Sequence, residues 1–232
     1  MLDILHATLA DQGCKTPEIS TDEMRRILAA GGTLVADSRP RPQFDAGYIP
    51  GAVCLDAAPE AQVAAVERLT GGDRTRPIVV YCNGPHCQQS RRLGDELAAA
   101  GYANTKRYQL GISVWRAMGG PTAVGLDWIE RVCEHDEMAV LIDVRAATAF
   151  RAGSLPRARN APVDDIAAGL SPVTGMPSDD FNRRVILFGA DGAQARRLAE
   201  ILRQRPWANV SYFDGSYADI AAALGSMTRA PG

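Results

Sequence analysis

The sequence predicts an α/β protein made of two similar domains, each with a central, mainly parallel sheet and helices on both faces. Short apolar runs typical of buried strands alternate with segments whose apolar residues keep helical spacing. The whole pattern occurs twice: Asp37 and Asp143 are 106 residues apart (143 − 37), and so are Phe44 and Phe150 (150 − 44). Such an offset indicates duplicated domains, since a solenoid repeats every ~20–50 residues.

The first half contains the elements of one such domain. Ser20 and Glu23 form a capping box that begins a helix, and Gly31–Gly32 ends it. The other expected elements are a strand over 33–37, a helix around 63–69, a strand over 78–82, a helix from Ser90 to about 101, a strand around 106–108 and a helix around 115. Gly119-Gly120-Pro121 marks a linker. We therefore expect domains over residues 1–120 and 121–232.

Composition excludes several classes of protein. A formal net charge of −2 over 232 residues gives no reason to expect nucleic acid or an anionic membrane as partner. No apolar run approaches the ~20 residues of a membrane helix, and the first 13 residues lack the features of a signal peptide. Five irregularly spaced cysteines favour free thiols in a reducing compartment over a disulfide framework. The expected location is the cytoplasm, and no metal site is expected.

The most informative stretch follows the strand Ile78–Tyr81. That strand leads into Cys82, and the loop then runs through Asn83, Gly84, Pro85, His86, Cys87, Gln88 and Gln89 to Ser90 and Arg91. A loop between a strand end and a helix N-terminus is where open α/β sheets bind ligands and where anions are favoured. With Ser90 as N-cap of the helix, this geometry is expected to lower the pKa of Cys82.

The second half has no thiol in the corresponding loop. Val185–Phe188 repeats the cysteine strand at an offset of 107 (188 − 81), whereas Leu198 matches Leu93 at 105 (198 − 93). The loop of the first half is therefore two residues longer than its copy, and we expect only the first domain to have a reactive site.

Taken together, these motifs resemble the rhodanese (sulfurtransferase) family. The resemblance rests on Asp-x-Arg at 37–39, Phe-x-x-Gly-x-Ile-Pro-Gly-Ala at 44–52, the strand-Tyr-Cys-loop-helix segment and the late Trp115, and it covers two tandem domains. It implies that Cys82 accepts sulfane sulfur as a persulfide. The family's usual loop is shorter, and Gln89 stands in place of its arginine. The loop is therefore longer and less positive than the family's usual loop.

The other candidate residues divide into two groups. Cys87 is a resolving thiol, an alternative nucleophile or a bystander, and His86 and Arg91 are candidates for contact with an anionic donor. Asp37 and Arg39 recur as Asp143 and Arg145 in the half without the thiols, which favours a structural ion pair over catalysis.

The function expected from these residues is transfer of sulfane sulfur from a donor, thiosulfate or a persulfide, to a thiol or cyanide, with no cofactor. Two alternatives remain open: a thiol redox protein that cycles a Cys82–Cys87 disulfide, and a non-catalytic rhodanese-like binding module. A phosphatase or arsenate reductase on the same fold would need an arginine where Gln88 stands.

Overall fold

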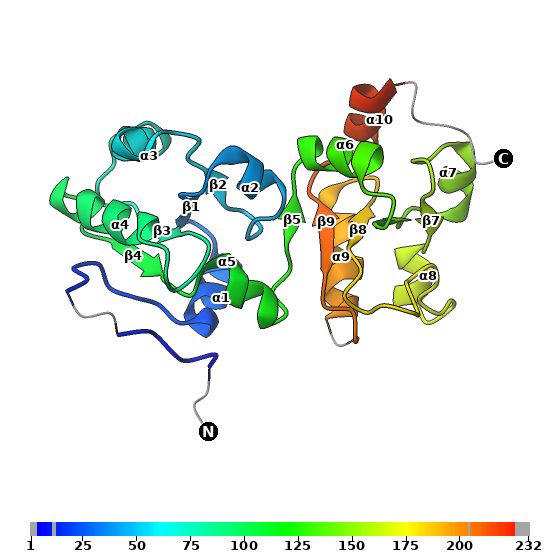
Figure 1. Ribbon diagram of the computed structural model, residues 1–232, viewed down its shortest axis with the longest axis horizontal. Coiled ribbons are helices and arrows are strands. Elements are labelled where there is room, and N and C mark those ends of the chain that lie inside the picture. Colours follow the sequence, from blue (N-terminus) through cyan, green and yellow to red (C-terminus); the bar gives the residue numbers. More distant parts are fainter. Residues whose placement is uncertain (1–3, 11–12, 204, 226–232) are drawn as a thin grey trace. The chain divides into compact units, whose positions relative to one another are not determined.

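The computed structural model describes residues 4–10, 13–203 and 205–225, which form two compact units (Figure 1). The first unit is Met1–Phe44 with Gly51–Met118, and the second is Asp45–Pro50 with Gly119–Gly232. The short segment Asp45–Pro50 joins the second unit because Tyr48 and Ala123 exchange two backbone hydrogen bonds of 2.9 and 3.0 Å. This segment is where the observed units differ most from the expected division at 1–120 and 121–232.

The first unit has a four-stranded parallel sheet in the order β2-β1-β3-β4. Its elements are α1 (Thr21–Ala30), β1 (Leu34–Asp37), α2 (Arg41–Asp45), β2 (Val53–Cys54), the 3-10 helix η1 (Pro59–Ala61), α3 (Gln62–Thr70), β3 (Ile78–Tyr81), α4 (Gln89–Ala99), β4 (Thr105–Tyr108) and α5 (Gly111–Ala117). Because all strands run parallel, the loops that follow β1, β2 and β3 meet at one edge of the sheet.

Helices cover both faces of this sheet (Figure 1). Leu34, Ile78 and Val80 of the strands pack with Leu93 and Leu97 of α4, and residues of α3 join the same cluster. On the other face lie α1 and α5, where Trp115 makes an edge contact with Tyr108 at 6.4 Å between ring centroids. The alternation of strand residues between two covered faces is what a buried parallel sheet requires.

The second unit repeats this design with one more strand. Its sheet has the order β5-β9-β8-β6-β7, and all of its pairs are parallel. Its elements are β5 (Ala123–Val124), α6 (Leu126–His135), β6 (Val140–Asp143), α7 (Ala147–Ala152), β7 (Arg159–Asn160), α8 (Val163–Ala167), β8 (Val185–Phe188), α9 (Gly192–Leu202), β9 (Val210–Phe213) and α10 (Tyr217–Leu224). The predicted fold class, two α/β domains with parallel sheets, is confirmed.

The buried faces of α4 and α9 fix the register between the repeats. Ser90, Leu93, Gly94 and Leu97 are buried on α4, and Ala195, Leu198, Ala199 and Leu202 are buried on α9 at a constant offset of 105 (195 − 90). The strands before them keep an offset of 107 (185 − 78). The first loop therefore has two extra residues in register terms, as predicted. In addition, α9 begins at Gly192, two residues before Gln194, which is the position that corresponds to the first residue of α4, Gln89.

Two predicted helix starts have different outcomes. Ser20 caps α1 as expected, accepting a hydrogen bond from the Glu23 amide at 3.2 Å. The Glu23 carboxylate, however, pairs with Lys106 at 2.7 Å. The prediction that Ser90 caps α4 is wrong, because the helix begins at Gln89 after Gln88 and its cap makes no side-chain hydrogen bond.

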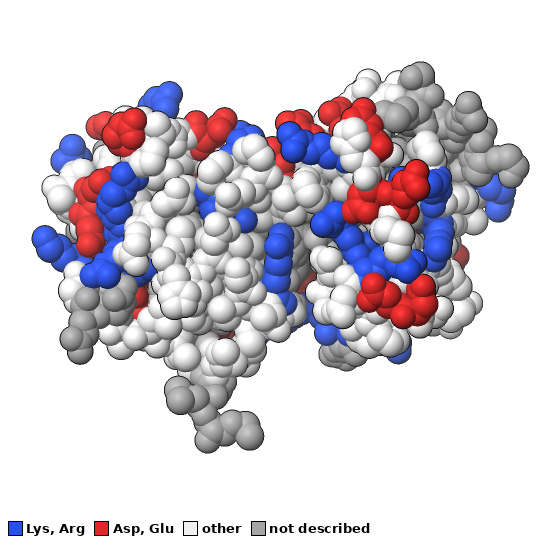
Figure 2. Space-filling view, viewed as in Figure 1, with Lys and Arg blue, Asp and Glu red and all other residues white. Residues whose placement is uncertain are grey.

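Charges of both signs are interspersed on each unit over the face shown in Figure 2. Within the described parts of the chain, we find no helix with the length and apolar character needed to cross a membrane.

Candidate active site

Cys82 lies immediately after β3 and is buried, with only 1% of its surface exposed. Its neighbours at the same sheet edge come from the end of β1, where the Ser38 amide and hydroxyl both donate to the Tyr81 carbonyl at 3.1 and 3.0 Å. The thiol is thus held at the carboxyl end of a central strand, as the sequence predicts. The same packing removes it from water.

Groups of Ser90 and Cys87 surround the Cys82 sulfur. The Ser90 hydroxyl lies 3.3 Å from Sγ, and the Cys87 carbonyl oxygen lies 3.6 Å from it. Burial raises the pKa of Cys82, and so does a hydrogen bond with the Cys87 thiol, whereas hydrogen bonds from the Ser90 side chain and amide lower it. The expected low pKa is therefore wrong: the Ser90 amide near the helix start acts in the predicted direction, but loss of hydration outweighs it.

Cys87 is the more exposed of the two thiols. A turn brings it back toward Cys82, with the Cys87 amide donating to the Gly84 carbonyl at 3.0 Å. Its Sγ donates to Gln89 Oε1 at 3.8 Å. Gln89 also borders a hollow of about 380 Å³. The hollow is lined by Ser38, Pro40, Arg41, Pro42, Asp56, Ala57, Ala58, Pro59, Gln62 and Gln89. A small molecule in it would meet Gln89, the hydrogen-bond partner of Cys87.

The start of α5 supports the cysteine loop from below. The Ile112 amide donates to the Cys82 carbonyl at 3.0 Å, and the Ser113 amide and hydroxyl donate to the Asn83 carbonyl at 3.1 and 2.7 Å. Gly111 has φ +62°, and a Cβ on it would collide with the Cys82 carbonyl and lie 2.6 Å from the Gly84 amide nitrogen. Only glycine allows the loop to approach this closely.

Other loop residues predicted from the sequence lie at the surface or contact other parts of the first unit. The Asn83 side chain donates to Gln43 Oε1 at 3.1 Å, and His86 and Gln88 are exposed. Arg91 Nη2 lies 3.4 Å from the position of a Cβ on Gly13, against the N-terminal segment. The structure therefore brings Cys82, Cys87 and Ser90 together and leaves His86 at the surface.

The two Asp-x-Arg motifs form matching ion pairs. Arg39 Nη2 lies 2.6 Å from Asp37 Oδ2 with both side chains buried, and Arg145 and Asp143 repeat the contact at 2.6 Å. Burial of the Arg39 guanidinium opposes its charge, but the Asp37 carboxylate more than compensates, so the pKa of Arg39 is raised. Since the second half, which has no cysteine in the corresponding loop, has the same pair, this contact belongs to the fold.

Sequence reasoning missed a second ion pair beneath the loop. Arg107 on β4 is fully buried and lies 3.3 Å from Glu18 Oε1, from the Ser90 hydroxyl and from the Cys87 carbonyl oxygen. Its sequence signal is an arginine at a buried strand position where the second repeat has Tyr212, 105 residues later (212 − 107).

The corresponding loop of the second unit is only Gly189-Ala190-Asp191. The Asp191 carboxylate caps α9 by accepting a hydrogen bond from the Gln194 amide at 2.7 Å. This helix start therefore already has an anion in place and no thiol. Among the residues that the structure describes, no group of three or more His, Cys, Asp or Glu side chains could hold a metal ion.

Comparison with known families identifies the class of protein. The Rhodanese-like domain matches residues 20–118 and again 126–223. These two matches cover most of the chain, so it belongs to the rhodanese-like family and contains two tandem domains of that family.

Individual relatives are more distant or match only in part. An HTH-type transcriptional regulator from Mycobacterium tuberculosis is 32% identical over 125 residues, 54% of this chain and 53% of the relative. The chain thus spans about half the length of this curated relative. Among solved structures, thiosulfate sulfurtransferase from Pseudomonas aeruginosa is 23% identical over 88% of this chain and 44% of its own, with a TM-score of 0.38. A complex of EanB with hercynine is 17% identical over 94% of this chain and 63% of its own, with a TM-score of 0.40.

Proposed function

We propose that this protein is a sulfurtransferase that moves sulfane sulfur from a donor such as thiosulfate to a thiol or cyanide through a persulfide on Cys82. The observation that carries the proposal is the placement of Cys82 at the end of β3 with the Ser90 hydroxyl 3.3 Å from its sulfur, in a member of the rhodanese-like family. The five cysteines are free thiols, which supports the expected cytoplasmic location.

The chemistry needs only a thiolate and groups that stabilise sulfur anions. The Cys82 thiolate attacks the outer sulfur of thiosulfate, a sulfur–sulfur bond forms, and sulfite leaves with the electron pair of the broken bond. Cyanide then attacks the outer persulfide sulfur, leaves as thiocyanate and restores the thiolate. Hydrogen bonds from the Ser90 hydroxyl and amide stabilise the negative sulfur in both states.

A thiol redox function is the second candidate, and it is favoured by the closeness of the two cysteines, since Cys82 Sγ donates to the Cys87 carbonyl at 3.6 Å. Cys87 is half-buried and donates to Gln89, which lines the hollow, whereas Cys82 is buried, so an oxidant or a substrate thiol would reach Cys87 first. In this case Cys82 and Cys87 would lose two hydrogens to an acceptor and form a disulfide. A non-catalytic binding module is the third candidate and would show neither reaction.

Formation of thiocyanate from thiosulfate and cyanide tests the proposal. Cys82→Ser should reduce turnover about a thousandfold or more, since it removes the nucleophile. Cys133→Ser is the matched control, because it removes a half-buried thiol of α6 in the second unit. Turnover that survives in Cys82→Ser would exclude Cys82 as the nucleophile. An inactive wild type in which every persulfide donor tried leaves the mass unchanged would exclude the enzyme.

A further inference from the structure

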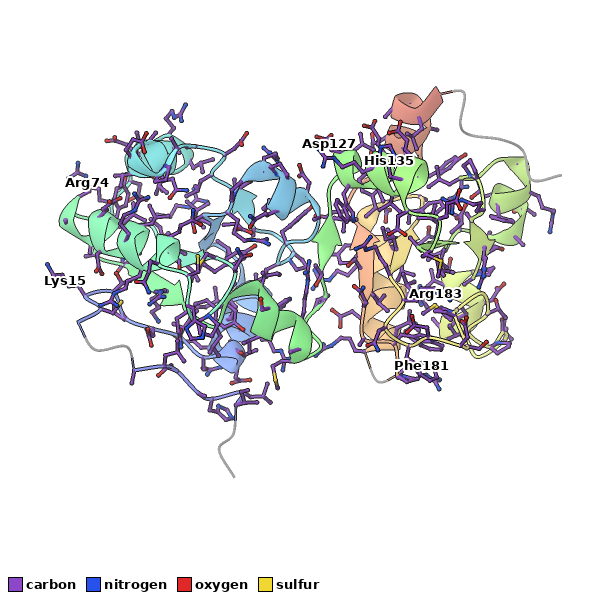
Figure 3. All side chains as sticks on the ribbon, viewed as in Figure 1. Lys15, Arg74, Asp127, His135, Phe181 and Arg183 are labelled. Atoms are coloured by element: carbon purple, nitrogen blue, oxygen red, sulfur yellow. The ribbon has the colours of Figure 1, made fainter. Side chains whose placement is uncertain are left out.

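The ion pair beneath the cysteine loop joins two separate parts of the first unit. Glu18 belongs to the N-terminal segment, which adds to the edge of β4: the Arg107 amide donates to the Pro17 carbonyl at 2.8 Å, and the Ile19 amide donates to the Arg107 carbonyl at 2.9 Å. The segment is also fixed to α4 through the Lys15 amide, which donates to Asp95 at 3.1 Å; Figure 3 labels Lys15 at this edge. Burying an ion pair costs desolvation energy, so a buried pair at this place indicates a local role.

Arg107 touches the same groups that surround the Cys82 sulfur. Its Nε donates to Ser90 Oγ, and its Nη2 donates to the Cys87 carbonyl, each at 3.3 Å. Those two oxygens are the ones that lie 3.3 and 3.6 Å from the Cys82 sulfur. Ser90 and Cys87 therefore link Arg107 to the thiol.

The hydrogen bond from Arg107 occupies one of the two lone pairs of the Ser90 hydroxyl. A guanidinium donates and never accepts, so Ser90 Oγ uses a lone pair for Arg107 and its own hydrogen is available for the Cys82 sulfur. A hydroxyl that donates to sulfur favours the thiolate and the persulfide anion over the neutral thiol. The Cys87 carbonyl, with a lone pair engaged by Arg107, repels that anion less.

The second repeat supplies an internal comparison. Ser90 corresponds to Ala195 at the shared offset of 105, and Arg107 corresponds to Tyr212. Glu18 bridges Arg107 in parallel, as Ala123 pairs with Tyr212. All three polar residues are thus absent from the repeat that has no cysteine in the corresponding loop, whereas the Asp-x-Arg ion pair is present in both. The Glu18–Arg107 pair accompanies the cysteine site and not the fold.

We propose that Arg107 is a positioning residue for the sulfur-carrying Cys82, acting through the Ser90 hydroxyl and the Cys87 carbonyl, with Glu18 moderating its charge. The inference deepens the proposed function and rests on it. The polar and charged groups that face Cys82 among the described residues are Cys87 from the loop, Ser90 from α4 and, behind these, Arg107 from β4 with Glu18.

The test measures the alkylation rate of Cys82 by iodoacetamide across pH, resolved by peptide mass, in the full chain. Arg107→Met should raise the pKa of Cys82 by about one unit or more, because it removes a cation and leaves the Glu18 carboxylate. Glu18→Gln should lower it, because the Arg107 charge is then uncompensated. Arg107→Lys should restore part of the shift. A role confined to folding would not move the pKa in opposite directions.

Controls keep the outcome decisive. Lys106→Met removes an exposed ion pair with Glu23 from the same strand and should leave the profile unchanged. Ser90→Ala should raise the pKa of Cys82 in wild type and have a smaller effect in Arg107→Met, since the hydroxyl is no longer oriented. If Arg107→Met fails to fold, the pKa of Cys82 in Glu18→Gln and in the double variant Arg107→Met/Glu18→Gln decides whether Arg107 has a positioning role.

Unchanged or same-direction shifts in Arg107→Met and Glu18→Gln would overturn the positioning role; where Arg107→Met is unfolded, an unchanged Glu18→Gln profile would. Alkylation does not require sulfur transfer, so the two proposals fail separately. Opposite shifts in a protein that loads no sulfur would support Arg107 as an organiser of the thiol and overturn the sulfurtransferase instead.

Discussion

At the scale of single residues, the reactivity of Cys82 results from two opposing effects. The Ser90 hydroxyl and amide favour the thiolate, and burial disfavours it more strongly, so the pKa of Cys82 lies above its ordinary value of 9.0. The neutral thiol is the form present at neutral pH. The sequence indicates the helix start that favours an anion, but it does not reveal how far neighbouring side chains exclude water from the sulfur.

A pH profile tests this balance. Below the pKa of a thiol the thiolate fraction rises tenfold per pH unit, so the rate of sulfur loading should rise about tenfold per unit between about pH 6 and pH 8. A plateau in this range would contradict the raised pKa.

The raised pKa also means that the buried thiol contributes to stability below its unfolded pKa, and that this contribution is lost as pH rises through the folded pKa.

Cys87 is expected to resolve the persulfide. Its carbonyl oxygen lies 3.6 Å from the Cys82 sulfur, so its thiol is placed to attack the inner persulfide sulfur, release sulfide and form a disulfide that a cellular dithiol must reduce. Cys87→Ser should therefore load sulfur at the wild-type rate but hold the persulfide several-fold longer. The measurement is persulfide lifetime by intact mass. Equal lifetimes would make Cys87 a bystander, and failure to load would make it the nucleophile.

At the scale of elements, the α5 start determines the shape of the cysteine loop. Gly111→Ala should lower the melting temperature and slow sulfur loading, since the new Cβ collides with the Cys82 carbonyl and φ +62° is itself strained. Gly119→Ala is a matched control: its φ is +69°, but nothing lies within 4 Å of its Cβ position. Equal effects of the two variants on loading would show that the loop tolerates the collision.

The helix boundaries show where local sequence patterns no longer predict the structure. Ser20 caps α1 because its side chain is available to the helix amides. Ser90 has the same preference, but its hydroxyl hydrogen-bonds Arg107 and Cys82 instead, and α4 begins without it. A cap preference is local, whereas these partners come from β4 and from the preceding strand end, so tertiary contacts override it.

At the scale of the whole molecule, the sequence predicts the duplication because strand and helix offsets of 105–107 residues are preserved at buried positions. The sequence does not predict that Asp45–Pro50 belongs to the second unit, since this depends on the contact between Tyr48 and Ala123. The sequence does not predict the Glu18–Arg107 pair either, because its partners are 89 residues apart.

The second domain should not gain sulfur transfer from a thiol alone. Gly189 occupies the position of Cys82 at the strand offset of 107 (189 − 82), yet Ala195 and Tyr212 stand where the first domain has Ser90 and Arg107. Gly189→Cys in a Cys82→Ser background should therefore load no sulfur above the background variant. Loading at the wild-type rate would show that the loop environment is dispensable.

The most direct test of the central claim is the mass of the reduced protein immediately after mixing with thiosulfate, with peptide mapping of the product. The account predicts a gain of one sulfur atom, located on the peptide that contains Cys82 and removed by cyanide. A loss of two hydrogens with Cys82 linked to Cys87, or no change with any persulfide donor, would contradict it.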